Sequence, residues 1–352
     1  MNNNNFTYTG IIHVHSTYSD GTKPVKDIVK IARQLDLDFL LLTDHNTMQA
    51  KFDGLEGWYD NVLLGVGCEL NDAQDRNHYL SFDYDEEIDS EMSKVDYVCK
   101  VRDMGGFGII AHPDENRQHI AKYPPFPWTL WESECYQGIE IWNQMSEWME
   151  GLTNQNKYWR VLHPRRSITT PKEETLTRWD EINMKRKVTG IGGVDAHEHI
   201  HKILGLIPFR VFRYKVSFKT IRTHVITPNP LTGKQSQYKK DLDTVYEAIK
   251  AARCFISNYY FGDANTFRFT AVSDNDQADM GDRIVNRSQI RLLVVNPGTA
   301  DTRLICNGRQ VQRKTGKEIE FAVKDAGVYR VETHVDNQPW ILSNHIRIEN
   351  ES

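Results

Sequence analysis

The stretch that decides the fold is GIIHVHSTYSDG, residues 10–21. Its apolar start, residues 11–14, predicts a short β-strand on which His13 and His15 lie two residues apart. Because side chains at positions i and i+2 of a strand point to the same side, both imidazoles can bind one metal ion. Asp20 follows after a polar turn and can fold back toward the same place. Two half-buried histidines that alternate by chance would give the same pattern, so the rest of the chain has to decide.

Strand and helix patterns alternate over roughly the first 260 residues. Residues 39–42 are a continuous apolar run, as is typical of a parallel strand buried on both faces. Residues 25–35 repeat apolar side chains at the spacing of an amphipathic helix. This alternation predicts an α/β architecture with a largely parallel sheet. The connection over residues 114–137 is rich in Pro and aromatic residues, which favours a lid or a pocket wall.

Side chains that can bind a metal recur at or just past the C-terminal ends of the predicted strands. They are His13, His15, His45, Glu69, His112, Asp195 and His197. Active sites of α/β barrels are built at that end, so a barrel would bring these side chains to one mouth. Chance would scatter them over helices and loops, as it scatters His119 and His163. The pattern therefore predicts a metal site.

Length and charge limit the class of protein. A chain of 352 residues favours two domains, and a net charge of -5 argues against bulk binding of nucleic acid. There is no apolar run of membrane-spanning length and no secretory signal at the N-terminus. The cysteines are scattered without a CxxC pair, which predicts neither a disulfide framework nor a cysteine zinc site. We therefore expect a reducing compartment and a cytoplasmic protein that does not bind membranes.

The pattern changes after about Gly262. Short alternating strands separated by turns such as Asn307-Gly308 predict a small all-β sandwich. We expect a first domain over residues 1–262 and a second over residues 263–352. The sandwich either supports the first domain or forms the interface of a homo-oligomer, and the sequence leaves both open.

The motifs HVHSTYSDG, LTDHN, NHYL, IIAHP and GGVDAHEH, with the strand-end Glu69, resemble the successive motifs of the PHP (polymerase and histidinol phosphatase) superfamily. They cover residues 10 to about 200 in the family's order. The resemblance implies a distorted (β/α)7 barrel, similar to a TIM barrel, that holds up to three metal ions. Downstream, TGIGGVDAH, EAIKAARCFISN and QPWILSNHIRI are similar to the PHP hydrolases related to carbaryl hydrolase, which join the barrel to a C-terminal sandwich. Arg253-Cys254 and His345 depart from that pattern, where a glycine and a proline are usual.

Carried over residue by residue, the resemblance implies a trinuclear centre of two to three divalent ions. The implied ligands are His13, His15 and Asp195 for the first ion, Glu69, His78 and His112 for the second, and Asp20, His45 and His197 for the third. Glu69 would bridge the first two ions, and Asp195, Glu69 and His197 are the candidate catalytic residues. Imidazole and carboxylate ligands suit Zn, Mn or Fe, and bound ions would lower the pKa of a water. Glu140 and Asn143 end a strand and are candidate hydrogen-bond partners of ligating histidines.

Residues that bind substrate are predicted less directly. Arg117, Arg165 and Arg166 lie in loops that could overhang the barrel mouth, where Arg suits capture of phosphate, although a solvated basic loop is the more common explanation for each. Trp142 could stack on an aromatic substrate or pack the lid. His199 could donate a proton to a leaving group or lie at the surface.

Three functional hypotheses follow. The first is a metal-dependent phosphoesterase acting on a small phosphorylated molecule or a nucleotide end. The second is a hydrolase of carboxylic or carbamic esters or amides, as the similarity to carbaryl hydrolase implies. The third is a non-catalytic metal-bound module, against which the complete set of ligands argues.

Overall fold

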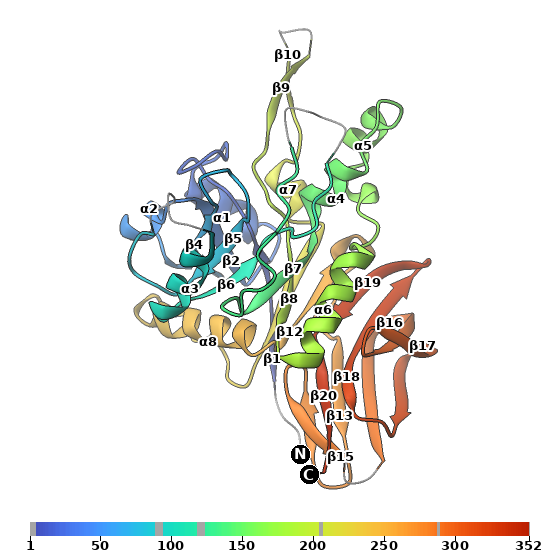
Figure 1. The fold of residues 1–352 in the computed structure, drawn as a ribbon. Helices are drawn as coiled ribbons and strands as arrows, with labels where there is room; N and C mark the ends of the chain where they lie inside the picture. Colours follow the sequence, from blue (N-terminus) through green and yellow to red (C-terminus); the bar gives the residue numbers. More distant parts are fainter. Residues whose placement is uncertain (1–4, 89–93, 118–123, 204–206, 287–288, 352) are drawn as a thin grey trace.

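The computed structural model describes residues 5–88, 94–117, 124–203, 207–286 and 289–351 (Figure 1). A mixed α/β region extends to about residue 260, and a strand-rich region follows it. Both ends of the chain lie at the strand-rich side of the molecule. The mixed α/β class and the strand-rich C-terminal part predicted from the sequence are thus both present.

The strands of the first region pair in succession around the site. They are β1 (Phe6–Ile12), β2 (Phe39–His45), β4 (Val62–Leu70), β5 (Tyr79–Phe82), β6 (Phe107–Ile110), β7 (Gly138–Asn143) and β8 (Thr189–Gly193). Only β5 runs antiparallel to its neighbours within this series. The His15 amide donates to the Ala196 carbonyl at 3.1 Å, which links the residues after β8 back to those after β1. The largely parallel order is confirmed, and the ends of β1, β2, β4, β6 and β8 face one side.

Further strands extend this region. They are β3 (Gly57–Tyr59), the paired β9 (Ile200–Ile203) and β10 (Ile207–Arg210), β11 (Ile221–Thr227) and β12 (Cys254–Asn258). β11 pairs with both β1 and β12 in antiparallel fashion. The hairpin of β9 and β10 projects from the body of the molecule beside α5 and was not foreseen from the sequence (Figure 1).

The helices cover the outside of these strands. They are α1 (Val25–Arg33), α2 (Gln49–Phe52), α3 (Lys94–Asp103), α4 (Gln144–Glu150), α5 (Lys157–Leu162), α6 (Glu173–Lys185), α7 (Tyr214–Ser217) and α8 (Tyr238–Lys250), with 3-10 turns η1 (Pro164–Ser167), η2 (Gln235–Gln237) and η3 (Tyr259–Phe261). The predicted amphipathic stripe of α1 is buried, because Val25, Ile28, Val29 and Ala32 face the core. The helical pattern expected over residues 145–162 is divided into α4 and α5.

The C-terminal region consists of strands that pack around a hydrophobic core, to which Ile226 and Phe255 of the first region also contribute. The strands are β13 (Arg268–Val272), β14 (Gln277–Asp279), β15 (Arg283–Asn286), β16 (Ile290–Cys306), β17 (Arg309–Val323), β18 (Gly327–Val335), β19 (Gln338–Ser343) and β20 (Ile346–Asn350). The predicted turn at Asn307-Gly308 joins β16 to β17, and both residues have positive φ, as a tight hairpin requires. β19 pairs with β12, so this region continues the sheet of the first.

A buried ion pair also joins the two regions. Asp180 on α6 accepts hydrogen bonds from Arg330 of β18 at 2.7 and 2.8 Å and from His345 at 2.6 Å. Asn344 bonds to both the amide and the carbonyl of Gly190 in β8. His345, which departs from the family pattern, therefore has a local hydrogen-bond partner in the carboxylate of Asp180.

The cysteines correct one prediction. Cys99 on α3 and Cys135, just before β7, form a disulfide with Cα atoms 5.0 Å apart. The two residues are 36 positions apart, and only the packing of α3 beside this connection brings them together. Because disulfides persist in oxidising compartments, the argument for a reducing compartment loses its support. Cytoplasmic location stays a prediction. In the part of the chain that the structure describes, no helix is long and apolar enough to cross a membrane.

Candidate metal centre and cavity

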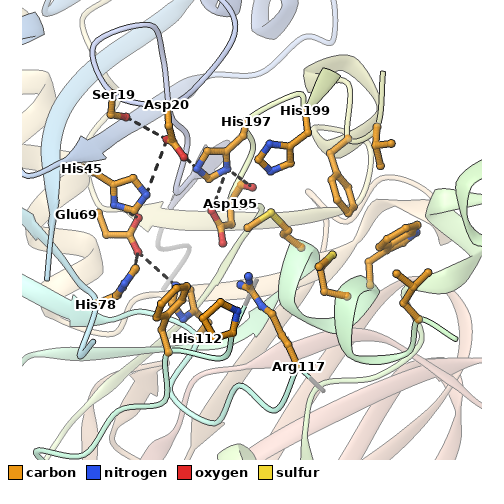
Figure 2. A pocket seen from close by; sticks show the side chains of 18 of the residues that line it. Ser19, Asp20, His45, Glu69, His78, His112, Arg117, Asp195, His197 and His199 are labelled. Atoms are coloured by element: carbon orange, nitrogen blue, oxygen red, sulfur yellow. Dashed lines mark hydrogen bonds and ion pairs between the residues drawn. The ribbon is translucent and has the colours of Figure 1, made fainter. Parts of the chain in front are cut away.

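The predicted metal-binding side chains converge at one end of the ring of strands (Figure 2). Three groups have candidate ligand atoms within 4.8 Å of one another: His13, His15, Glu69 and Asp195; His15, Asp20, His45 and His197; and His45, Glu69 and His78. His112 adjoins the third group, with its Nε2 3.3 Å from Glu69 Oε1. The structure therefore brings all nine predicted ligands together, including His78, which lies at the start of β5 and not at a strand end.

Glu69 lies at the centre of this cluster. Its Oε2 faces His13 Nε2 at 3.0 Å and His15 Nε2 at 3.1 Å. Its Oε1 faces His78 Nδ1 at 2.7 Å. Each carboxylate oxygen thus has its own set of imidazoles, which is the arrangement that a bridging carboxylate needs. The whole side chain is 1% exposed.

Two more carboxylates complete the cluster. Asp195 Oδ1 lies 3.4 Å from His15 Nε2 and 3.3 Å from His197 Nδ1. Asp20 lies at the open side, with its side chain 54% exposed and its Oδ1 3.1 Å from His197 Nε2. Figure 2 shows Asp20 between His45 and His197. The group that contains Asp20, with His15, His45 and His197, is therefore the one nearest to solvent.

Burial and the carboxylates act on the histidines in opposite directions. Burial favours neutral imidazole, but the nearby carboxylates of Asp195 and Glu69 outweigh it and raise the pKa of His15 to about 9. For His78 the charge of Glu69 likewise outweighs burial and raises the pKa to about 10. For His45 burial dominates and lowers the pKa to about 4. The carboxylates therefore favour positive charge within the cluster.

The donor atoms fit divalent metal ions. His15 is fully buried, and among the described residues neither of its ring nitrogens has a partner in hydrogen-bonding geometry. The same is true of His78 Nε2 and His112 Nδ1. Buried polar atoms without partners are unfavourable, and a cation bound to such nitrogens removes that penalty. Imidazole and carboxylate donors without thiolates suit zinc, manganese or iron.

Glu140 on β7 orients the ligands. Its Oε1 accepts a bond from His13 Nδ1 at 2.9 Å, and its Oε2 accepts the His112 amide at 2.8 Å and Asn143 Nδ2 at 2.9 Å. A proton held on His13 Nδ1 leaves the lone pair of Nε2 directed at the cluster. Glu140 therefore contacts His13, a predicted ligand, and Asn143 contacts Glu140. Gly193 makes room for it, because a Cβ there would lie 1.9 Å from Glu140 Oε1.

Asp44 is a residue that the sequence reasoning missed. Its Oδ1 accepts the Ser16 amide at 2.7 Å and the Ser19 hydroxyl at 2.6 Å, and so it fixes the loop that carries Asp20. The sequence feature that could have revealed this role is a carboxylate within an apolar strand, immediately before His45. Alternation along β2 turns Asp44 and His45 to opposite sides, so only His45 reaches the cluster.

The backbone at the site is strained in several places. His13, His112 and Asp195 have φ values of 68°, 27° and 51°, in the region that residues with a side chain rarely adopt. Such conformations cost of the order of 1–3 kcal/mol each and occur where function over-determines the geometry. Three predicted ligands thus have backbones that the surrounding fold must hold in place.

The cluster opens into a cavity of about 1020 Å³. Among the predicted substrate residues, Arg117 and His199 line it. Arg117 is buried and pairs with Glu115, and its guanidinium lies 6.0 Å from the Phe126 ring centroid. The His199 ring stacks on His197 at 5.3 Å. Part of the predicted lid, residues 118–123, lies outside the described residues, while Phe126 of that lid does line the cavity.

Three other predicted substrate residues are not among the described residues that line this cavity. Arg165 donates to the carbonyls of Lys219 and Tyr259, and Arg166 donates to the Tyr260 hydroxyl. Both arginines hold η1 against neighbouring segments and do not overhang the mouth. Their placement depends on tertiary packing that a loop sequence does not encode.

Trp142 is also placed elsewhere. It is 1% exposed, and its Nε1 donates to Glu147 on α4 at 2.7 Å. A shift in the pairing of β7 with β8 falls between Glu140 and Trp142, so the rule that positions i and i+2 share a side fails here. Trp148, in the second turn of α4, lines the cavity instead.

Part of the chain matches a known protein family. Residues 12–123 match the family model of the PHP domain. This segment is similar to the PHP domain. The matched segment contains the ligand-bearing ends of β1, β2, β4 and β6, and the remaining predicted ligands, Asp195 and His197, follow β8 outside it. The resemblance that the motifs indicated is thereby shown.

The sequence identity to each of the following similar proteins is low. The uncharacterized protein MJ1587 of Methanocaldococcus jannaschii is 24% identical over 115 residues, 29% of this chain, and the match spans 66% of that protein, just under two thirds. A two-domain protein from Bacteroides vulgatus, described as containing a predicted PHP-like metal-dependent phosphoesterase, is 15% identical with a TM-score of 0.48, covering 97% of this chain and 95% of that one. PsfC from Pseudomonas syringae is 14% identical with a TM-score of 0.41, covering 66% of this chain and 88% of its own.

Proposed function

We propose that this protein is a metal-dependent hydrolase, specifically a phosphoesterase that acts on a small phosphorylated molecule. The observation that carries the proposal is Glu69, whose two oxygens face separate sets of imidazoles in a buried cluster. The ligands in this proposal are His13, His15, Asp20, His45, Glu69, His78, His112, Asp195 and His197. The PHP domain supports the same class of chemistry.

The proposal includes the architecture in its finer form. We take residues 1–262 as a distorted (β/α)7 barrel of PHP type and residues 263–352 as a β-sandwich. The pairing around the ring and the return from Ala196 to His15 support the first part. The hydrophobic core that is formed mainly by the C-terminal strands supports the second.

Divalent ions, when bound, lower the pKa of a water and neutralise charge that develops on the phosphoryl oxygens. The chain's own residues do the rest. Glu140 holds His13 in the tautomer whose Nε2 is free. Arg117 supplies a buried guanidinium beside the cluster, suited to a phosphoryl oxygen. His199 lies at the open side, next to His197, where its imidazole can protonate a leaving oxygen.

A second candidate is the hydrolysis of carboxylic or carbamic esters or amides. The observation that favours it is the wall of the cavity opposite the cluster, which is largely apolar and would accept an uncharged ester. The two candidates differ in whether Arg117 meets a charged group. Neither involves bulk binding of nucleic acid, against which the net charge of -5 argues.

The test is hydrolysis by the full chain reconstituted with zinc, manganese or iron. Aryl and nucleoside phosphates are compared with naphthyl esters and carbamates, using Asp195→Asn and His15→Ala. The exposed His163, away from the cluster, provides the matched control His163→Ala. Release of phosphate that both site variants abolish and the control retains supports the proposal. Turnover of esters or carbamates alone would select the second candidate, and metal binding without turnover of either would refute both.

A further inference from the structure

We infer that the substrate carries a large apolar group, an alkyl chain or an aryl ring, next to the phosphoryl group that the metal cluster binds. The inference rests on the proposed phosphoesterase function and names the class of its substrate. It comes from the wall of the cavity that faces the cluster, which neither the motifs nor the family resemblance describes.

Helix α4 presents this wall. Met145, Trp148 and Met149 follow one another at the i, i+3, i+4 spacing of one face of α4, and Leu152 comes just after the helix ends at Glu150. All four line the cavity, so this apolar face is turned partly toward an open volume. An amphipathic helix normally buries such a face against protein, which indicates that the open volume receives an apolar ligand.

Other segments complete the same wall. The additional apolar residues are Val161 and Leu162 of α5, Val211 and Phe212 after β10, and Pro124 and Phe126 of the lid. The rings of Trp148 and Phe212 meet edge to face with centroids 4.7 Å apart. The Trp148 Nε1 donates to the Arg160 carbonyl at 3.2 Å, so the polar edge of the indole is satisfied within the protein. The ring therefore has no polar group left that a ligand must match.

The two ends of the cavity have different chemistry. At one end lie the carboxylates and imidazoles of the cluster, and Arg117 lies between them and the helices (Figure 2). Phe126 links the ends, because its ring stacks on His78 at 4.9 Å and also lies beside Arg117. A molecule that satisfies both ends has an anionic head and an apolar body.

Volume and exposure agree with this assignment. A cavity of about 1020 Å³ is at the upper limit of ordinary ligand pockets, and a phosphoryl group alone would occupy a small part of it. At the mouth, Leu162 and Tyr158 of α5 are each 73% exposed. Large apolar side chains gathered at the rim of a pocket are typical of a binding site.

The test uses alkyl phosphonates, which cannot be hydrolysed, so that binding is measured without turnover. Calorimetric titration of the metal-loaded full chain compares methyl-, butyl-, octyl- and 1-naphthylphosphonate. Burial of each methylene contributes about fourfold to affinity, so we expect octyl- or naphthylphosphonate to bind more than about 100-fold tighter than methylphosphonate. Tight octyl binding identifies a chain, and tight naphthyl binding identifies a ring. Equal affinity for all four compounds would overturn the inference.

Two variants test the wall without disturbing the core. Leu162→Gln and Met149→Gln change side chains that are exposed or half-buried, and each should weaken octylphosphonate about tenfold while methylphosphonate is unchanged. Trp159→Ala is the matched control, since Trp159 is on α5 but is not among the described residues that line the cavity. If neither variant alters octyl binding, the apolar group lies elsewhere and the inference fails.

Removing the metal separates this inference from the proposed function. If the head site is as proposed, methylphosphonate binds only to the metal-loaded chain. Chain-length dependence that persists without metal, together with no metal effect on methylphosphonate, would refute the phosphoryl site and leave the apolar wall supported. Metal-dependent binding without chain-length dependence would do the reverse.

Discussion

Glu140→Gln tests how far the metal centre depends on a residue that is not itself a proposed ligand. The carboxylate accepts bonds from His13 Nδ1 on one oxygen, and from the His112 amide and Asn143 Nδ2 on the other. Glutamine has the same shape but only one acceptor oxygen. Its NH₂ must therefore face either His13 Nδ1 or the His112 amide, both of which are donors.

Either orientation disturbs a proposed ligand. If the NH₂ faces His13, the imidazole must accept at Nδ1 and carry its proton on Nε2, which then cannot bind a metal. If it faces His112, a buried amide loses its partner. Loss of such an orienting partner typically lowers metal affinity tenfold to 100-fold, about 1.4–2.8 kcal/mol. We expect that loss for the ion bound by His13, with the fold intact because the side chain keeps its volume.

The assay is competition with a chromophoric chelator, which gives the number of ions bound and the affinity of each. Glu147→Gln is the matched control, because Glu147 is also a buried carboxylate that accepts several bonds, from Trp142, Thr169 and Thr170, but touches no proposed ligand. Circular dichroism checks that both variants fold. If Glu140→Gln binds as many ions as the parent chain with affinities within threefold, the orienting role is refuted.

Three more outcomes follow from contacts elsewhere in the fold. Asp180→Asn leaves the buried Arg330 without its principal partner and should lower the free energy of unfolding by about 3–5 kcal/mol in urea titration; a loss below about 1 kcal/mol would contradict this. Burial lowers the pKa of His224 from 6.5 to about 3, so as the pH falls the unfolded chain protonates this histidine before the folded chain does. The free energy of unfolding should therefore fall by up to about 1.4 kcal/mol per pH unit below pH 6.5. His224→Gln should reduce that slope, and an unchanged slope would refute the assignment. Gly193→Ala should displace Glu140 and reproduce the metal loss of Glu140→Gln in the same chelator assay, whereas full metal binding would show that the carboxylate tolerates the added carbon.

The parts that the sequence could predict are those set by local geometry. His13 and His15 were expected on one side of a strand, but β1 ends at Ile12 and His13 has a φ of 68°, so both histidines follow the strand and do not lie on it. Their convergence with the other candidate ligands follows from the common direction of the parallel strands, whose ends meet at one edge. The buried stripe of α1 followed from spacing in the same way.

The parts that could not be predicted depend on a one-residue shift in strand pairing or on contacts between segments that are distant in the sequence. The shift in β7 between Glu140 and Trp142 places the indole away from the cavity, and nothing in GIEIWN marks it. Arg165 is held by backbone carbonyls that only the folded chain brings near. Cys99 and Cys135 meet for the same reason.

The role of the C-terminal strands, left open between support and assembly, can be argued from where they touch the first region. Asn344 accepts the Gly190 amide at 2.8 Å and donates to the carbonyls of Gly190 and Cys254 at 2.9 Å. Gly190 lies in β8, the strand that leads to Asp195. Because the backbone at Asp195 is in a strained conformation, it has to be held by what surrounds it. Contacts that fix β8 from the C-terminal side therefore help to hold Asp195 within reach of His15, which favours a supporting role for these strands.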